Sequence, residues 1–432
     1  MRFLWILLMI GVFVHVEAIE PFSKVPPAEM IMMGSFDDDD VESTDDFPQP
    51  VTPVSDKRDI DKNGETTDLY IKNSSKKPID LSEQERYGEE IEESVDFSEY
   101  SQQQGFSQNI DLSEYMTRGS LKVALLAPKK VIKSYTNSVS NAIMSYLIFK
   151  DVPFQFEVFD SGDEEEASIY QKLSEIRAKG YQLVIAPFTQ KGAEIVIRNA
   201  SDLLVFIPTI NKYEVPDASE NIIFGGIDYR RQIDALLTYA NDKIVLFNDG
   251  SRRSQELSTY IKEQVFDSVV YEKDIKKIKT NLKGIIKNNK KLKKSSIFLN
   301  MPIVKSSLLA SQLSQYDVEP HVLLSTQANY NPLLFKLTQS KDREYFYIAN
   351  SISSYDSKLK EINLLLGNNP SFSWIDYSAS IGMDYILSMQ FESGQRVFNE
   401  DIYDNQIEYK VHIEKAGESS FKPVSDKGFN SY

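Results

Sequence analysis

From Leu121 onward, short apolar runs rich in β-branched residues alternate with stretches whose apolar residues recur at helical spacing. This alternation is typical of α/β proteins built on parallel strands. The first series predicts strands over residues 122–128, 154–159, 182–187, 203–208 and 222–224. It also predicts helices over residues 139–149, 164–179 and 231–239.

The same alternation starts again at Lys243. It predicts strands over residues 243–247, 268–271, 296–299 and 321–324, and helices over residues 254–265, 273–294 and 304–316. A chain of about 310 such residues is too long for one core, so a series that restarts midway predicts two lobes. We expect the first lobe at about 119–241, with returning C-terminal segments, and the second at about 242–345.

Residues 19–118 lack this pattern. They are rich in Asp, Glu, Pro and Gln, and their sparse apolar residues show no sustained period. Such a segment buries too little apolar surface to offset the entropy of ordering it. We therefore expect a disordered acidic segment.

The first eighteen residues carry the features of a secretory signal peptide. Arg2 precedes an apolar run from Phe3 to Val14, and Ala18 offers a cleavage site. An apolar run this short does not span a bilayer about 30 Å thick. We expect a mature chain that begins at Ile19 and has no membrane span after cleavage.

Composition narrows the chemistry. The chain has no Cys, which excludes disulfides and thiolate catalysis, and it has three His. A Cys-free exported protein fits a bacterial periplasm better than a eukaryotic secretory route.

The formal net charge is −16. Residues 19–118 hold 25 acidic and 9 basic residues, whereas residues 119–432 hold 38 of each, so the imbalance lies in the acidic segment.

A short motif recurs inside the acidic segment. Residues 79–83, 95–99 and 110–114 share the pattern aliphatic, Asp, Leu or Phe, Ser, Glu. These copies have the character of docking motifs that fold onto a partner. The candidate anchors are Leu81, Phe97, Leu112, Tyr100 and Tyr115. The alternative is chance recurrence in a tract of this composition.

No catalytic signature stands out. The sequence has no Gly-rich phosphate loop, no Gly-x-Ser-x-Gly elbow and no His-Glu-x-x-His motif. The acidic residues 163–166 precede a predicted helix, where carboxylates interact favourably with the helix dipole. The predicted helix over residues 273–294 carries ten lysines, with Ile275, Ile278, Leu282 and Ile285/Ile286 on one face. It forms either a solvated face or a site for a polyanion, the nearest polyanion being the acidic segment itself.

The ordered series of motifs in residues 119–425 resembles the type I periplasmic binding proteins. The matching segments are the strand 121–128, the strand-and-turn 184–189, the strand 206–209, the crossover 228–240, the helix 376–385 and the closing segments 396–398 and 407–411. The resemblance implies a two-lobed α/β fold of two parallel, Rossmann-like sheets. The nearest branch is the C-terminal domain of the outer-membrane activators of penicillin-binding proteins, which implies action by protein contact.

The chain departs from that family at two ligand turns. Lys129, Lys130 and Lys133 stand where the family has a Gly-containing loop, and residues 190–192 replace a Ser/Thr-rich turn after Thr189. The resemblance therefore does not extend to amino-acid capture. The chain also lacks the activators' lipid-bearing Cys and their N-terminal helical repeats. The polar candidates at strand ends, where α/β sheets place their ligand sites, are Lys129, Lys133, Thr189, Gln190 and Asp228.

We expect a non-catalytic periplasmic scaffold or regulatory protein of the bacterial cell envelope that acts by protein–protein contact. Its client would be a peptidoglycan synthase or a large envelope machine such as a flagellar motor. The alternative is a periplasmic solute receptor that closes on a small ligand in the inter-lobe cleft. The sequence predicts no cofactor, no metal site and no nucleic-acid partner.

Overall fold

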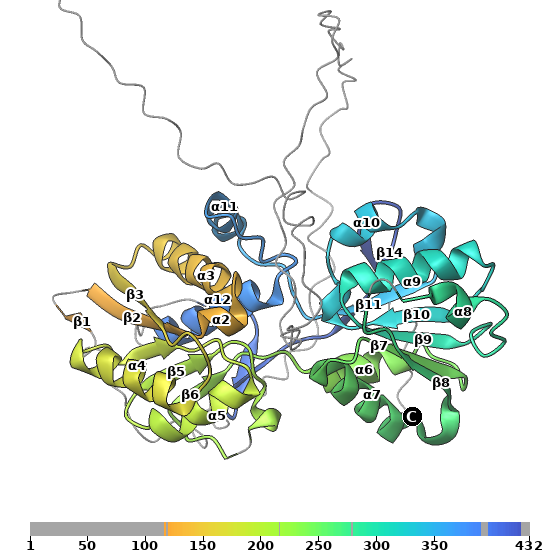
Figure 1. The fold of residues 1–432 in the computed structure, drawn as a ribbon. Coiled ribbons are helices and arrows are strands. Elements are labelled where there is room, and N and C mark those ends of the chain that lie inside the picture. Colours follow the sequence, from red (N-terminus) through yellow and green to blue (C-terminus); the bar gives the residue numbers. More distant parts are fainter. Residues whose placement is uncertain (1–115, 118–119, 216, 278–279, 390–395, 425–432) are drawn as a thin grey trace, which may run out of the picture. The chain divides into compact units, whose positions relative to one another are not determined.

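The computed structural model describes residues 116–117, 120–215, 217–277, 280–389 and 396–424, which form two α/β lobes (Figure 1). The first lobe is built on a sheet in the order β1-β2-β4-β5-β6-β13-β12, with β3 also paired to β2. Its strands are β1 (Met116–Thr117), β2 (Ser120–Ala127), β3 (Phe154–Asp160), β4 (Leu183–Ile185), β5 (Leu204–Ile207), β6 (Ile222–Phe224), β12 (Asp401–Tyr403) and β13 (Gln406–Glu408).

The second lobe is built on a sheet in the order β15-β14-β11-β10-β9-β7-β8. Its strands are β7 (Ile244–Asn248), β8 (Val269–Asp274), β9 (Ser296–Asn300), β10 (Val322–Ser325), β11 (Phe346–Asn350), β14 (His412–Ala416) and β15 (Phe421–Pro423). The strands predicted from the apolar runs are all present, and the two-lobed α/β fold class is confirmed.

Both sheets are mixed rather than parallel. The central strands pair in parallel, but β12 runs antiparallel to β13, and β14 runs antiparallel to β11. Asp404 and Asn405, which join β12 to β13, have φ values of 49° and 62°. Two consecutive positive φ values are the geometry of a tight hairpin turn, which connects only antiparallel neighbours.

Helices cover both faces of the first sheet (Figure 1). Successive residues of a strand point to opposite faces, so Val123 and Leu125 of β2 pack in one core, while Ala124 and Leu126 pack in another. The first core includes α3 (Tyr135–Phe149) and α12 (Trp374–Ser388), and α11 (Ser357–Leu365) contacts α3. The second core includes α4 (Glu166–Ala178) and α5 (Gln190–Asn199).

The second sheet is covered in the same way. Leu246 of β7 packs with α6 (Tyr229–Leu237) and α7 (Arg252–Val265), whereas Val245 and Phe247 pack with α8 (Leu282–Ile286) and α9 (Ile303–Gln315). Helix α6 contacts β11 and α7 and therefore lies with the second sheet, although it precedes β7 in the chain. The remaining helices are α2 (Lys129–Ile132), α10 (Leu333–Leu337), η3 (Lys212–Glu214), η4 (Phe266–Ser268), η5 (Gln327–Asn329) and η6 (Ser340–Arg343).

The prediction of one long lysine-rich helix over residues 273–294 is wrong. Among the residues of this stretch that the structure describes, which leave out 278–279, only α8 is α-helical, and it is followed by Asn288, whose φ is 65°. Like-charged lysines three or four residues apart repel one another on a helix, and Asn readily adopts the left-handed conformation that ends one. The apolar positions Ile275, Leu282 and Ile286 are nevertheless buried, as the pattern predicted.

None of the helices in the described residues is long and apolar enough to cross a membrane.

Candidate functional site

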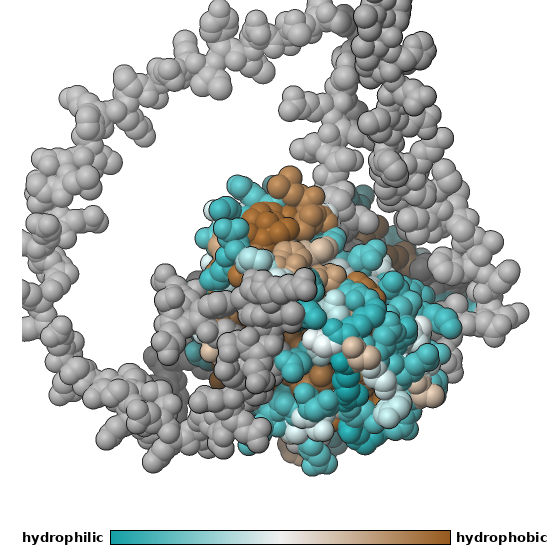
Figure 2. All heavy atoms as spheres, turned by 90° about the vertical axis from the view of Figure 1, so that its left-hand side faces the viewer, coloured by the Kyte–Doolittle hydropathy of each residue, from teal (hydrophilic) through white to brown (hydrophobic). Residues whose placement is uncertain are grey.

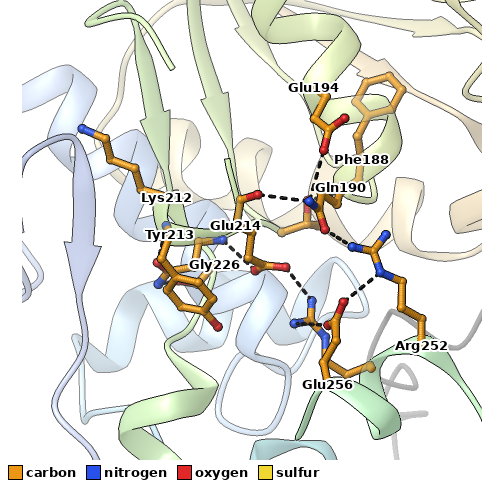
Figure 3. A network of polar contacts seen from close by, with 12 residues as sticks. Phe188, Gln190, Glu194, Lys212, Tyr213, Glu214, Gly226, Arg252 and Glu256 are labelled. Carbon is orange, nitrogen blue, oxygen red and sulfur yellow. Dashed lines mark hydrogen bonds and ion pairs between the residues drawn. The ribbon is translucent and has the colours of Figure 1, made fainter. Parts of the chain in front are cut away.

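The candidate site lies where the loops after β4 and β5 meet the start of α7 (Figure 3). The N-terminal ends of three helices, α5, η3 and α7, position its side chains. Thr189 is the N-cap of α5, and Ser251 caps α7 by accepting a hydrogen bond from the Ser254 amide. Asn211 and Glu214 form a capping box at η3, so the Glu214 side chain is held beside the first lobe's strand ends.

Gln190, at the first position of α5, links the two lobes. Its side-chain amide donates at 3.1 Å to Glu194 and at 3.1 Å to the backbone carbonyl of Glu214. Its side-chain oxygen accepts a hydrogen bond from Arg252 of α7 (Figure 3). Arg252 in turn donates to Glu256 one turn later, at 2.8 Å. A first-lobe amide is thereby tied to a second-lobe guanidinium.

A second link joins Arg253 to Glu214. The Arg253 Nη2 atom lies 3.2 Å from a Glu214 carboxylate oxygen, and its Nη1 atom lies 3.4 Å from Glu256. Burial alone lowers the pKa of Arg253, but Glu214, Tyr229 and Glu256 more than offset burial, so the pKa is raised and the group stays charged. The Glu214 side chain is 9% exposed and that of Arg253 is 17% exposed.

An open cavity of about 490 Å³ adjoins these links. One wall is Arg230, whose guanidinium lies 4.3 Å from the ring centre of Tyr213 and 5.5 Å from that of Tyr260. Arg230 forms no ion pair with any described residue. The lining further includes Tyr229, Ile233, Gln255, Leu257, Thr259 and Glu263. Aromatic faces, one unpaired cation and several polar groups are the composition of a small-ligand pocket.

By contrast, the space between the strand ends themselves is nearly filled. A second hollow, lined by Phe188, Thr189 and Thr209 together with Arg252 and Arg253, has a volume of about 10 Å³. That is about the smallest space that holds one water molecule. Arg252, Arg253 and Glu256 of α7 form one wall of this hollow.

The structure brings two of the five cleft candidates together. Thr189 and Gln190 are consecutive at the start of α5, but the Thr189 amide donates at 2.8 Å to Glu164, and its hydroxyl donates to the same carboxylate. Lys129 and Lys133 lie at the two ends of α2 with exposed side chains. Asp228 caps α6 by accepting hydrogen bonds from the amides of Arg230 and Arg231. Neither lysine lines either hollow, and neither does Asp228.

Sequence reasoning missed the residues that make the links. Glu164 was assigned to a helix-terminal cluster, but it is 6% exposed and bonds to Thr189. Arg252 and Arg253 carried a usable signal, because two cations in the first turn of a helix oppose its dipole. Such an arrangement indicates that other groups compensate them: Glu214 pairs with Arg253, and Glu256 pairs with both arginines.

The docking candidates Leu81, Phe97, Leu112, Tyr100 and Tyr115 lie outside the described residues.

A separate apolar surface lies at the end of α11. Leu365 is 84% exposed and Leu364 is 48% exposed, and the chain leaves the helix at Leu366. Figure 2 shows a hydrophobic area at the top of this face, at the height where Figure 1 places α11. Leu364 and Leu365 are consecutive in the chain, so the two exposed side chains leave α11 at the same place.

Among the described residues, no three His, Asp or Glu side chains are grouped so that they could hold a metal ion.

Comparisons with known proteins identify the fold of this chain. No protein-family model matches the chain, and no curated protein matches it. One matching structure is LivJ from Streptococcus pneumoniae, the substrate-binding protein of a branched-chain amino acid transporter, solved with isoleucine. It matches with a TM-score of 0.54 and 11% sequence identity, over 71% of this chain and 99% of LivJ. The leucine-binding protein LivK from Thermotoga maritima matches with a TM-score of 0.51 and 14% sequence identity. The match covers 70% of this chain and 97% of LivK.

The chain has the fold of the type I periplasmic binding proteins. The C-terminal domain of LpoA from Haemophilus influenzae, a regulator of PBP1A, also matches, with a TM-score of 0.46 and 8% identity over 70% of this chain and 99% of that domain. A TM-score below 0.5 gives no reason to prefer it over the amino-acid-binding proteins. At these identities the comparisons show the fold alone.

Proposed function

We propose that this chain is a non-catalytic, exported protein of the bacterial cell envelope whose binding-protein fold acts by protein–protein contact. The signal-peptide features of residues 1–18 support export to the periplasm. Solved structures that match with a TM-score above 0.5, LivJ and LivK among them, are binding proteins.

The observation that carries the proposal is that the chain's own side chains fill the strand-end turns of the first lobe, beside the open cavity. Arg252 bonds to Gln190, Arg253 pairs with Glu214, and both hydrogen-bond donors of Thr189 bond to Glu164. A ligand entering here would have to break these contacts. Each displaced partner would leave a desolvated polar or charged group, which costs about 1–3 kcal/mol or more.

The exposed leucines of α11 support a protein partner. Covering apolar surface contributes about 25 cal/mol per Å², and Leu364 and Leu365 offer such surface outside the folded core. A peptidoglycan synthase or a large envelope machine is the client class we propose, with Leu81, Phe97 and Leu112 as further contacts from the acidic segment.

The cavity beside Arg230 favours a second candidate function. A solute receptor would place its ligand there, beside Tyr213, Arg230 and Tyr260, rather than at the strand ends. The unpaired guanidinium would meet a carboxylate or phosphate of the ligand.

Thermal unfolding of the full chain with a panel of free amino acids separates the two functions. A ligand present at one hundred times its Kd stabilises the folded state by about 2.7 kcal/mol, which moves the unfolding midpoint by several degrees. We expect no shift, because the strand-end turns are occupied. A shift lost on Thr189→Ala would establish an amino-acid receptor with the family's cleft. A shift lost on Arg230→Gln, but kept on Thr189→Ala, would place a ligand in the cavity; either shift refutes the protein-contact proposal.

The proposed contact with a protein partner is tested by affinity capture from the native envelope, with the full chain as bait. We expect one envelope protein to be retained by the wild type and released when Leu364 and Leu365 are both changed to Ser. Val304→Ser, which alters an exposed residue of α9, is the matched control. Triple replacement of Leu81, Phe97 and Leu112 by Ala tests the repeated motif separately. Equal retention by every variant would remove both surfaces from the proposal.

A further inference from the structure

One face of the second lobe is covered by lysines, and these form what we call the lysine surface. The stretch from the end of β8 to the start of β9 lies against the second sheet, with Ile275, Leu282, Ile286 and Leu292 packed in its core. Between these anchors every described lysine is exposed. The nine lysines are Lys273, Lys276, Lys277, Lys283, Lys287, Lys290, Lys291, Lys293 and Lys294.

This surface runs along the whole length of β7. At one end, the aliphatic stem of Lys276 lies against Gly250, which follows β7. At the other end, the Lys243 ammonium donates to the backbone carbonyls of Lys290 and Lys293, just before β7 begins. The lysines are thus spread over one continuous side of the lobe, held by a buried apolar row.

The positive charges of the lysine surface are not neutralised by acidic neighbours among the described residues. None of the nine lysines forms an ion pair within the described part of the chain, although lysines elsewhere, such as Lys191 and Lys262, pair with Glu165 and Glu272. The one acidic residue in the stretch is Asp274, which is also exposed. Nine unpaired cations on one face raise a positive potential that attracts anions.

The complementary charge is in the same chain. Residues 19–118 carry 25 acidic residues against 9 basic ones, including four consecutive aspartates at 37–40 and Glu89, Glu90, Glu92 and Glu93. Residues 119–432 are formally neutral, so their lysine surface is balanced by acidic residues placed elsewhere on the lobes.

We propose that the lysine surface binds the chain's own acidic segment, 19–118. The contact is intramolecular, multivalent and electrostatic. It holds the segment and its repeated motifs against the second lobe until a partner or a high salt concentration releases them.

The tether is long enough for this contact. The acidic segment joins the first lobe at β1 and β2, and about eighty residues separate the aspartates at 37–40 from Ser120. A flexible chain of that length has a root-mean-square reach of about 50 Å. The resulting effective concentration of the acidic groups is on the order of a millimolar, which lets individually weak ion pairs act together.

Carbodiimide crosslinking of the full chain, read by peptide mass spectrometry, tests the contact because it joins only touching amine and carboxylate pairs. We expect crosslinks between lysines of 273–294 and carboxylates of 37–46 or 89–93 at 50 mM salt. They should fall at least about tenfold at 1 M salt, where the screening length is about 3 Å. The yield of these crosslinks should fall by the same factor when six lysines are changed to Gln: Lys276, Lys277, Lys283, Lys287, Lys290 and Lys291.

The matched control changes six exposed lysines outside this surface to Gln: Lys129, Lys336, Lys341, Lys358, Lys360 and Lys410. This control should keep the crosslinks and the compaction at low salt seen by small-angle X-ray scattering. The proposal is overturned if the acidic segment crosslinks equally to the control lysines, or if the crosslinks join two chains. It is also overturned if no such crosslinks form while added polyphosphate binds the wild type more tightly than the six-lysine variant, since the partner would then be an external polyanion.

Discussion

The guanidinium of Arg253 in α7 lies 3.2 Å from the carboxylate of Glu214 in η3, and this ion pair joins the second lobe to the first. It stands among the strand-end turns of the first lobe. The Asn211 amide also donates to Glu214, at 3.1 Å, so the carboxylate is fixed from both sides. Both residues also line the open cavity, so the ion pair forms part of its wall.

A double-mutant cycle with Arg253→Met and Glu214→Gln should show coupling of about 0.5–3 kcal/mol, because the two groups touch and are mostly buried. Each single variant should unfold at a lower denaturant concentration than the wild type, and the double variant should lose less than the sum. Arg231→Met with Glu408→Gln is a more exposed ion pair for comparison and should couple more weakly. Additive losses at Arg253 and Glu214 would mean that the pair does not stabilise the fold.

Replacing Asp376 by Asn should stabilise the protein at neutral pH and have little effect at pH 4. Burial in α12 raises the pKa of Asp376 from 3.8 to about 6, although a hydrogen bond from Ser138 lowers it in part. Because the folded pKa exceeds the unfolded pKa, the stability contributed by this group is present below pH 4 and is lost as the pH rises through 6. A shift of about two units corresponds to about 3 kcal/mol.

The test for Asp376 compares chemical unfolding of the wild type and Asp376→Asn at several pH values. The difference in unfolding free energy should grow between pH 4 and pH 7 and then level off. A difference that does not depend on pH would show that the ionisation of Asp376 is not its cause.

Gly382→Ala should destabilise the first lobe by about 1–3 kcal/mol or more. A Cβ atom there would lie 2.2 Å from the ring of Phe206, which is fully buried in β5 and has no room to move. Gly284→Ala in the exposed helix α8 is the control, since its Cβ would meet nothing closer than 3.4 Å. That change should be neutral or stabilise by up to about 1 kcal/mol, because Ala is the better helix former. Thermal unfolding midpoints that do not separate the two variants would contradict this packing.

The mature protein should begin at Ile19, since the apolar run ends at Val14 and Ala18 is the small residue at the predicted cleavage site. Intact-mass measurement on protein recovered from the periplasm checks this. A mass that still includes residues 1–18 would indicate a retained membrane anchor.

Limited proteolysis should remove most of residues 19–118 and leave a fragment that begins near residue 119. The reason is the change near Gly119 from an acidic, aperiodic sequence to regular apolar runs. N-terminal sequencing of the resistant fragment gives the boundary. Cleavage should be faster at high salt if the lysine surface holds the segment, and a resistant species that keeps the whole segment at every salt concentration would contradict disorder.

The strands and most helices followed from local pattern, because a buried strand must be apolar on both faces and a covering helix must be apolar on one. The runs at β2, β4, β5, β7 and β9 satisfy this condition almost without exception. The pattern failed between β8 and β9. There the apolar residues are buried as predicted, but the repulsion among lysines and the Asn residues break the backbone into turns.

The two-lobed α/β fold and the location of the charge imbalance follow from the sequence alone. Which side chains meet at the strand-end turns depends on the tertiary structure. Glu164 meets Thr189 across 25 residues, Gln190 meets Arg252 across 62, and Glu214 meets Arg253 across 39. Local periodicity reports burial along one element, whereas these contacts depend on how loops from two sheets come together. That arrangement is set by the packing of the whole chain.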